Sequence, residues 1–289
     1  MANIRDLRKR IRAVESTKQI TKAMEMVAAA KLRRAQQRIE SYRPYAEKMM
    51  AMLGSLSAAS GEVSHPFFEQ RDVKRSALVL FTSDRGLCGS FNSNLIRRAE
   101  EFKKDYTPDN LDLICVGRRG LDYYKKRGFP VVKSYIDFSG NMDLAKVRDL
   151  NMYLSNRFLS GEIDRIYFLY TAFITTVRYR ITLKQFLPIA QEFALDDDSQ
   201  HAEREYIFEP DAPSIFSKLL PSYAQTVAQM SMAESLASEH GTRMIAMGAA
   251  TRNAGEMIDT LTLVMNKARQ ASITTELLEI VSGAEALKG

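Results

Sequence analysis

The sequence predicts an α/β domain inserted between two long terminal helices that pair as an antiparallel coiled coil. Three observations support this prediction. Apolar residues near both ends of the chain recur at alternating steps of three and four, as in a coiled-coil seam. Proline is almost absent from both terminal stretches. The middle of the chain alternates short apolar runs with helical stretches, which is typical of a largely parallel sheet covered by helices.

Residues 1–60 are predicted to form the N-terminal helix of the pair. The segment is rich in good helix formers and contains a single proline, Pro44. The spacing of its apolar residues favours a left-handed coiled coil over a free surface helix. The seam consists of Ile4, Leu7, Ile11, Val14, Ala28, Leu32, Ala35, Ile39, Tyr42, Ala46, Met49, Leu53 and Leu56.

This seam has a polar gap in its middle. The in-phase positions there are Lys18, Thr21 and Glu25, whereas the apolar residues lie on a neighbouring face of the helix. That face is formed by Ile20, Ala23, Met24 and Val27. Two interpretations remain open: a change of packing partner within the same molecule, or an apolar surface offered to another protein.

Residues 75–210 are predicted to form the α/β domain, with a Rossmann-like arrangement. Continuous apolar runs at 76–81 and 111–116 indicate strands that are buried on both faces. Two further strands are expected within 163–173 and 177–187, and an exposed loop at 194–204. The intervening helices are expected at about 92–104, 118–127 and 143–160.

Residues 213–289 are predicted to form the second long helix. No proline occurs in 222–285, and the same rhythm of three and four continues as far as Ala268. Beyond this point polar residues enter the seam positions, and the apolar set moves to Ile273, Leu277 and Ile280. Mixed faces beyond the end of a coiled coil suggest a helix end held inside another protein.

The charge is concentrated at the N-terminus. The chain carries a net charge of +6, but its first 60 residues hold thirteen Lys/Arg and five Asp/Glu, an excess of +8. Such a segment usually meets an acidic partner. One alternative is therefore a basic coiled-coil protein that binds nucleic acid.

Composition and motifs argue against several classes of protein. The 289 residues have an ordinary content of apolar (45%) and charged (26%) residues, and no apolar run approaches the ~18 residues of a membrane span. The two cysteines and three histidines are far apart, so neither a disulfide framework nor a zinc site is expected. The N-terminus lacks a secretion or import signal. These features predict a soluble, cytosolic, reduced protein.

No enzyme active site is apparent. The first predicted strand leads into a glycine turn, at residues 83–89, where phosphate sites often lie, but neither G-x-G-x-x-G nor G-x-x-x-x-G-K-[ST] is present. Cys88 has no histidine placed by sequence to activate it. We therefore expect no catalytic, cofactor-binding or metal-binding residues in this chain.

Three blocks carry a resemblance to a known family. Residues 16–32 (STKQITKAMEMVAAAKL) closely resemble the N-terminal signature of the gamma subunits of F-type ATP synthases, in their bacterial form. Residues 83–89 (SDRGLCG) resemble that family's central motif, and residues 247–253 with 261–283 resemble its C-terminal signature. The blocks lie in the family's order.

The resemblance implies a non-catalytic central-stalk rotor subunit of a proton-translocating ATPase, in which the catalytic residues belong to the beta subunits. The implied partners are three alpha and three beta subunits, the epsilon subunit and the membrane ring of c subunits. Proton or sodium flow would turn the ring and this shaft, driving ATP synthesis. The implied location is peripheral, on the cytoplasmic face of the bacterial plasma membrane.

The resemblance also assigns contact residues. It implies that Arg269 and Gln270, with Thr274 and Glu276 further along the helix, contact beta-subunit loops. Met24 falls in the N-terminal signature, and Lys18 and Lys22 are expected to face an acidic loop of the beta subunits. The foot that contacts the c-ring and epsilon is expected at Tyr206, Ile207, Phe208 and Glu209.

Overall fold

The structure is a computed structural model that describes residues 4–60, 65–138, 140–189 and 212–286. The chain divides into two compact units. The terminal unit comprises residues 1–28 and 244–289, and the central unit comprises residues 29–243. Two helices, α1 (Ile4–Ser60) and α5 (Ala212–Ala286), each contribute to both units.

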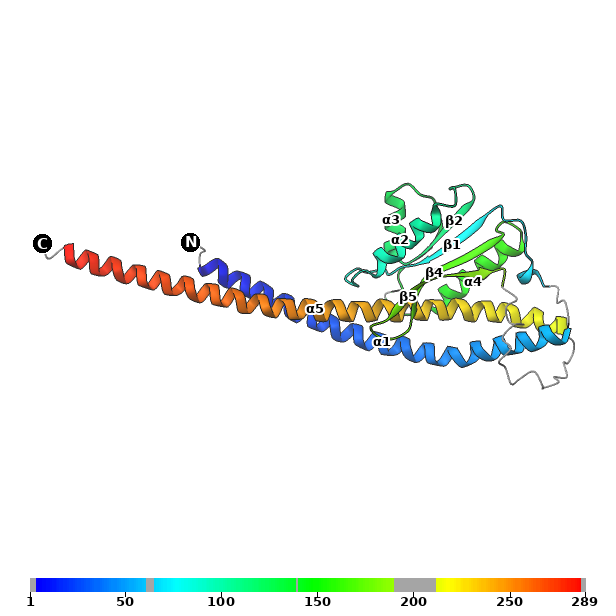
Figure 1. Cartoon of the computed structure of the whole chain (residues 1–289), viewed down its shortest axis with the longest axis horizontal. Coiled ribbons are helices and arrows are strands. Elements are labelled where there is room, and N and C mark those ends of the chain that lie inside the picture. Colours follow the sequence, from blue (N-terminus) through cyan, green and yellow to red (C-terminus); the bar gives the residue numbers. More distant parts are fainter. Residues whose placement is uncertain (1–3, 61–64, 139, 190–211, 287–289) are drawn as a thin grey trace. The chain divides into compact units, whose positions relative to one another are not determined.

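The central unit contains a five-stranded sheet in the order β3-β2-β1-β4-β5 (Figure 1). The first four strands in this order are parallel, and only the last pairing, β4 with β5, is antiparallel. The expected largely parallel sheet is therefore confirmed. The strands are β1 (Ser76–Phe81), β2 (Leu111–Val116), β3 (Val131–Tyr135), β4 (Arg165–Phe173) and β5 (Tyr179–Leu187).

Burial explains which strands the sequence reveals. Every residue of β1 and of β2 is buried, as their continuous apolar runs predict. Strand β3 was not predicted: it is a five-residue edge strand in which half-buried and exposed positions alternate before the buried Tyr135, and it contains Lys133 and Ser134. So short and polar a strand is specified by pairing with β2 rather than by its own composition.

Among the described residues, three helices complete the α/β domain: α2 (Phe91–Lys103), α3 (Arg118–Lys126) and α4 (Leu144–Leu159). Each lies within a residue or two of its predicted range. In α2, Phe91, Leu95, Ala99 and Phe102 form a buried stripe that packs into the sheet core. Asp143 caps the N-terminus of α4, because its carboxylate accepts hydrogen bonds from the backbone amides of Ala145 and Lys146.

Both predicted long helices are present. α1 has 57 residues and α5 has 75, so their lengths are roughly 85 Å and 110 Å at 1.5 Å per residue. α1 continues through Pro44 and α5 through Pro221. A short 3-10 helix, Pro66–Phe68, follows α1. The predicted loop at 194–204 lies outside the described residues.

Within the central unit, α1 and α5 pack along the predicted seam. Leu32, Ala35, Ile39, Met49 and Leu53 are all buried. The Thr226 hydroxyl of α5 lies 3.8 Å from the Met49 sulfur of α1. Residues late in α1 therefore meet residues early in α5, as an antiparallel pair requires.

Within the terminal unit, the same two helices are again antiparallel. The Thr251 hydroxyl donates to the Thr21 hydroxyl over 2.9 Å. Further along, Gly255 faces Lys18, whose Nζ would lie 3.3 Å from a Cβ at that glycine. Leu7 is buried, and the other apolar seam residues at the start of α1 are half-buried.

Candidate functional site

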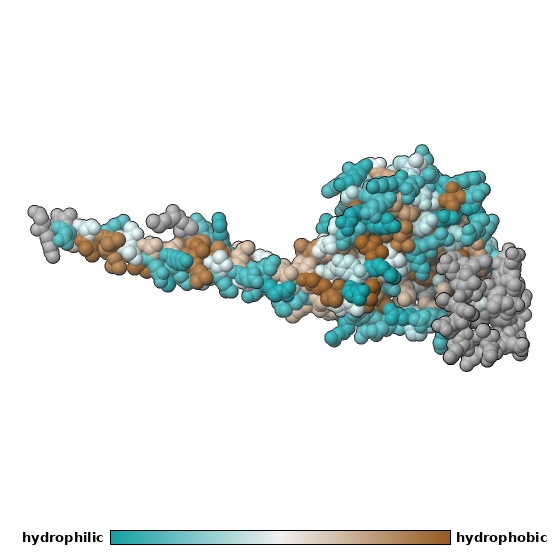
Figure 2. Space-filling view, viewed as in Figure 1, coloured by the Kyte–Doolittle hydropathy of each residue, from teal (hydrophilic) through white to brown (hydrophobic). Residues whose placement is uncertain are grey.

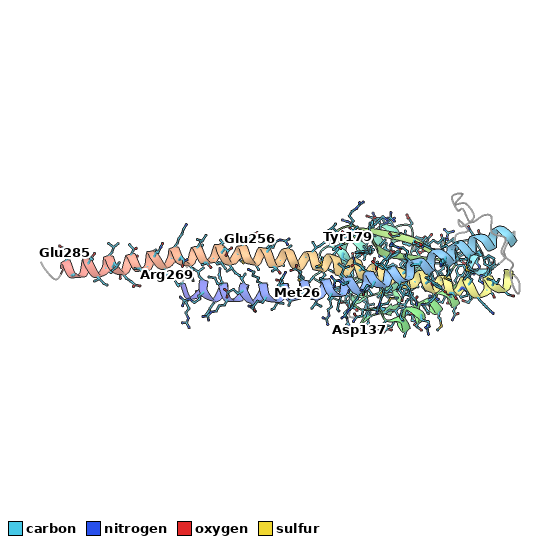
Figure 3. The ribbon with its side chains drawn as sticks, turned by 90° about the horizontal axis from the view of Figure 1, so that it is seen from below. Met26, Asp137, Tyr179, Glu256, Arg269 and Glu285 are labelled. Atoms are coloured by element: carbon cyan, nitrogen blue, oxygen red, sulfur yellow. The ribbon has the colours of Figure 1, made fainter. Side chains whose placement is uncertain are left out.

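The last part of α5 has no helix beside it among the described residues. Thr251 faces Thr21 and Gly255 faces Lys18, so the same register brings Ile4, the first residue of α1, opposite the region of Arg269. In Figure 3, α1 accompanies α5 only about as far as Arg269, whereas α5 continues to Glu285. The side chains of residues 273–285 are all exposed. This segment is called the α5 end below.

Apolar side chains are nevertheless frequent on the α5 end, and Figure 2 shows brown, apolar side chains gathered there. Their exposed fractions range from 50% for Ile273 to 67% for Ile280. A soluble helix does not normally expose a row of large aliphatic residues, so the row indicates a surface that another molecule covers. The row consists of Ile273, Leu277, Leu278, Ile280 and Val281.

The predicted contact residues form two rows on this helix. With about 100° per residue, Arg269 and Glu276 lie on one side of Ile273, at the edge of the apolar row, whereas Gln270 and Thr274 lie on the other side, among Leu277 and Val281. All four are exposed. The Glu276 carboxylate accepts a hydrogen bond from the Ser272 hydroxyl at 3.2 Å, and the Thr274 hydroxyl donates to the Gln270 carbonyl at 2.9 Å. The result is an apolar stripe that one polar row borders and the other interrupts.

The gap in the α1 seam has a structural explanation. Its polar residues face small residues of α5: Glu25 lies against Gly248, Thr21 against Thr251 and Lys18 against Gly255. Small partners leave room for long polar side chains along the seam. The apolar residues of the gap are therefore turned away from α5.

These outward residues form a second exposed apolar surface, called the α1 stripe below. Ile20 is 58% exposed and Val27 is 56% exposed, Ala23 is also exposed, and Met24 is half-buried. Met26, which Figure 3 labels, is a further exposed neighbour. Of the two interpretations left open by the sequence, the exposure favours a surface offered to another protein.

The predicted basic contacts of α1 lie on a different side from Met24. Lys22 forms an ion pair with Glu25 at 3.2 Å, and Lys18 lies next to α5. Both line an open groove of about 890 Å³ with Glu15, Gln19, Thr251 and Ile258. The structure thus brings Lys18 and Lys22 together but separates them from Met24. The predicted foot residues, Tyr206, Ile207, Phe208 and Glu209, lie outside the described residues.

The central motif is a loop that joins the ends of neighbouring strands. Asp84 follows β1, and its carboxylate accepts hydrogen bonds from the amides of Arg118, after β2, and Asp137, after β3, at 3.1 and 3.2 Å. Cys88 is buried, and this burial raises the pKa of its thiol, which disfavours the reactive thiolate. The motif is thus built to organise the domain.

Helix α5 occupies the crevice where a fold of this type binds ligands. The strand order reverses between β1 and β4, and ligands usually bind beyond the carboxyl ends of strands at such a point. Here Arg243 of α5 donates to the carbonyls of Arg85 and Gly86, after β1, at 3.1 and 3.3 Å. Ser238 donates to the carbonyl of Thr171, near the end of β4, at 3.1 Å. The crevice is filled by the chain itself.

Sequence reasoning missed this buried polar cluster. Glu239 and His240 are 5% and 2% exposed, and the Glu239 carboxylate lies 2.7 Å from Arg243. Burial raises the pKa of Glu239, and the Arg243 charge opposes that rise. Burial lowers the pKa of His240 to about 4, so the ring is neutral near pH 7. The available signal was three titratable residues within five positions of a helix otherwise rich in alanine, serine and methionine.

The described residues offer little for other chemistry. Within them, no three His, Cys, Asp or Glu side chains lie close enough together to hold a metal ion. None of the described helices is both long and apolar enough to cross a bilayer.

Comparison with known proteins is consistent with this architecture. The profile of the ATP synthase family (ATP-synt) matches residues 3–287. The chain is 42% identical over 288 residues to the ATP synthase gamma chain of Desulforamulus reducens, and 44% identical over 289 residues to that of Moorella thermoacetica. Each alignment covers 100% of both chains.

Solved structures agree with the sequence relatives. A chain from the central stalk and c-ring of the Tetrahymena thermophila mitochondrial ATP synthase matches with a TM-score of 0.60 and 25% identity, covering 80% of this chain and 99% of that one. A chain from the Euglena gracilis mitochondrial ATP synthase matches in fold, with a TM-score of 0.66 and 18% identity, covering 98% and 94%. With full-length relatives above 40% identity, the chain belongs to the family of ATP synthase gamma chains.

Proposed function

We propose that the chain is the central-stalk rotor subunit of an F-type ATP synthase and couples ion flow through a membrane ring to ATP synthesis or hydrolysis by rotation. The observation that carries this proposal is the α5 end, a helix with an exposed apolar stripe, polar residues at its edge and within it, and no partner among the described residues. Such a surface suits insertion into a protein cavity. Because the relatives are gamma chains, we propose that this cavity is the ring of alpha and beta subunits.

The mechanism follows from the asymmetry of this surface. The Arg269 row and the Gln270 row point in different directions around one helix, and the apolar residues cover one side of it. Each beta subunit around the shaft would therefore meet a different set of contacts at any moment. A ligand shifts a conformational equilibrium only through contacts that differ between conformers, and a rotating asymmetric shaft provides such differences in turn. Catalysis would reside in the beta subunits, and this chain would be a non-catalytic subunit.

The proposed assembly contains three alpha and three beta subunits, an epsilon subunit and a c-subunit ring. The matched structures are of a central stalk with a c-ring and of an F1 assembly with a c-ring, which supports this set of partners. The chain would lie at the cytoplasmic face of a bacterial plasma membrane, held there through the complex. Residues 1–60 and 213–289 would form the shaft and residues 75–210 the domain beside it, with the foot at 206–209.

At the contact surface, Arg269 and Gln270 would hold beta-subunit loops through charged and neutral hydrogen bonds. Thr274 and Glu276 would extend the same two rows. On α1, Met24 would contribute to an apolar contact, while Lys18 and Lys22 would meet acidic side chains of the beta subunits. The nucleic-acid alternative receives no support from the relatives, which are gamma chains.

Reconstitution tests this proposal. The purified chain is mixed with alpha and beta subunits of a close bacterial relative, and the complex is sized and assayed for ATPase activity. We expect a 3:3:1 complex whose turnover depends on this chain. If no complex forms although circular dichroism shows folded helices, the proposal is wrong, and a fluorescence titration with duplex DNA at two salt concentrations would test the nucleic-acid alternative.

A further inference from the structure

Helix α5 is attached to the α/β domain through directional contacts that converge on one guanidinium group. Arg243 Nη1 donates to the Glu239 carboxylate at 2.7 Å and lies 3.3 Å from His240 Nδ1. Its Nη2 donates to the carbonyls of Arg85 and Gly86. The two terminal guanidinium nitrogens therefore serve two partners each: Nη1 on the helix, and Nη2 on the loop after β1.

His240 extends the attachment to a second loop. Its Nε2 lies 2.8 Å from the Gly140 carbonyl, between β3 and α4. A carbonyl oxygen only accepts hydrogen bonds, so Nε2 carries the ring proton, and Nδ1 is left to accept from Arg243. The order of donation is thus Arg243 to His240 to Gly140. The side chains of this lock, defined as Glu239, His240 and Arg243, hold α5 to the ends of two different strands.

The neighbouring helix surface makes weaker directional contacts. Toward the sheet, α5 presents small residues, among them the buried Ala233 and Ala237, and the Ser238 hydroxyl adds a neutral hydrogen bond to the Thr171 carbonyl. Apolar burial resists separation but is non-directional, so it holds a helix against a sheet without fixing its angle. Buried charged hydrogen bonds do fix an angle, because a turned helix would leave Glu239 and Arg243 buried without partners.

We propose that Glu239, His240 and Arg243 lock α5 rotationally to the α/β domain, so that torque passes between the domain and the shaft through this contact. The inference rests on the proposed rotor function and adds a positioning role for residues outside the α5 end and the α1 stripe. The lock occupies the crevice that a nucleotide would take in a ligand-binding relative of this fold. In this chain, helix α5 occupies the position that a ligand takes in such proteins.

The test measures torsional stiffness in the assembled 3:3:1 complex. The ring is fixed to a surface, and a bead is attached to the domain through Lys125→Cys, an exposed position at the end of α3. The native Cys88 and Cys115 are buried, so the introduced thiol is the reactive one in this chain. The variance of the bead angle is recorded while the complex is stalled without turnover.

Two substitutions are compared. Arg243→Gln removes both the positive charge and the forked set of N–H donors. Arg243→Lys keeps the charge and can still reach Glu239, but its ammonium group cannot donate to four acceptors at once. We expect the angular variance to rise at least about twofold in Arg243→Gln and by less in Arg243→Lys, because directional contacts are lost in that order. The control is Arg98→Gln, which breaks an exposed ion pair with Glu101 on α2 and should leave the variance unchanged.

Each outcome is decisive. An assembled Arg243→Gln complex with unchanged variance would overturn the lock. If Arg243→Gln does not assemble, the Lys variant decides: increased variance supports the lock, and unchanged variance or failure to assemble contradicts it, since the residue would then serve folding alone. Failure of the proposed function is distinguishable, because the unsubstituted chain would form no complex.

Discussion

Gly117 occupies a position that no other residue can take without distortion. Its φ is +95°, and a Cβ there would lie 2.1 Å from the Thr82 carbonyl oxygen. Gly117→Ala therefore combines backbone strain with a clash against fixed backbone, and we expect a loss of at least about 3 kcal/mol in unfolding free energy. Gly128→Ala is the matched control: φ is +68° but the space is open, so about 1 kcal/mol is expected. Equal losses in denaturant unfolding would contradict this account.

Arg269 is exposed, so its role can be separated from stability. Arg269→Ala should change the unfolding free energy of the isolated chain by less than about 0.5 kcal/mol. If the guanidinium makes a charged hydrogen bond to a beta subunit, association should weaken by about 1.5–3 kcal/mol. The affinity is measured by titrating the labelled chain with the complex of alpha and beta subunits. Arg98→Ala, an exposed substitution on α2, is the control and should leave the affinity unchanged. Unaltered affinity for Arg269→Ala would remove it from the contact surface.

His240 makes stability depend on pH in a defined window. Its pKa is lowered from 6.5 to about 4 by burial, so the unfolded chain binds the proton more readily than the folded chain. The stabilisation is complete above pH 6.5 and is lost as the pH falls toward 4, by up to about 3 kcal/mol. The raised pKa of Glu239 acts in the opposite direction, since its stabilisation is lost as pH rises.

The His240 contribution is isolated by comparison with His240→Gln, which retains an amide donor for the Gly140 carbonyl. Unfolding free energies of both chains are measured from pH 7 to pH 4. The unsubstituted chain should lose more stability than the variant over this range, because only it gains a proton on that side chain when it unfolds. Parallel pH curves would refute the prediction.

At the scale of elements, the sequence predicts what burial and periodicity determine. The strands at 76–81 and 111–116 and the helices at 92–104, 118–127 and 143–160 were found because apolar pattern alone specifies them. Strand β3 was missed because pairing, not composition, forms it, and the antiparallel direction of β5 depends on a hairpin that the pattern does not encode. The lock at Arg243 depends on which loops meet α5, and only the fold brings them together.

The α1 stripe provides a prediction at the element scale. Met24→Lys places a charge beside Ile20 and Val27, on a surface that we propose contacts a beta subunit. Burying that charge would cost free energy in some shaft positions more than in others. We expect the enzyme to assemble but to pump fewer protons per ATP hydrolysed, measured in reconstituted vesicles. Met24→Leu keeps the apolar contact and serves as the control. An unchanged pumping ratio in Met24→Lys would exclude this contact.

At the scale of the whole molecule, the family and its role could be predicted from three sequence blocks, whereas the foot at 206–209 remains a proposal outside the described residues. The excess of +8 in the first 60 residues has a physical consequence for assembly. If it meets acidic side chains of the ring, association should slow as ionic strength rises, since screening shortens the reach of charges to about 8 Å at 0.15 M salt.

Rotation is the most direct test of the central claim. A complex of alpha, beta and this chain is fixed to a surface through its ring, with a bead on the Lys125→Cys position of the α/β domain. On addition of ATP, the account predicts that the bead turns in one direction, in steps that slow when ATP is limiting. A bead that stays still, or fluctuates without direction, while the same immobilised complexes hydrolyse ATP would contradict the account.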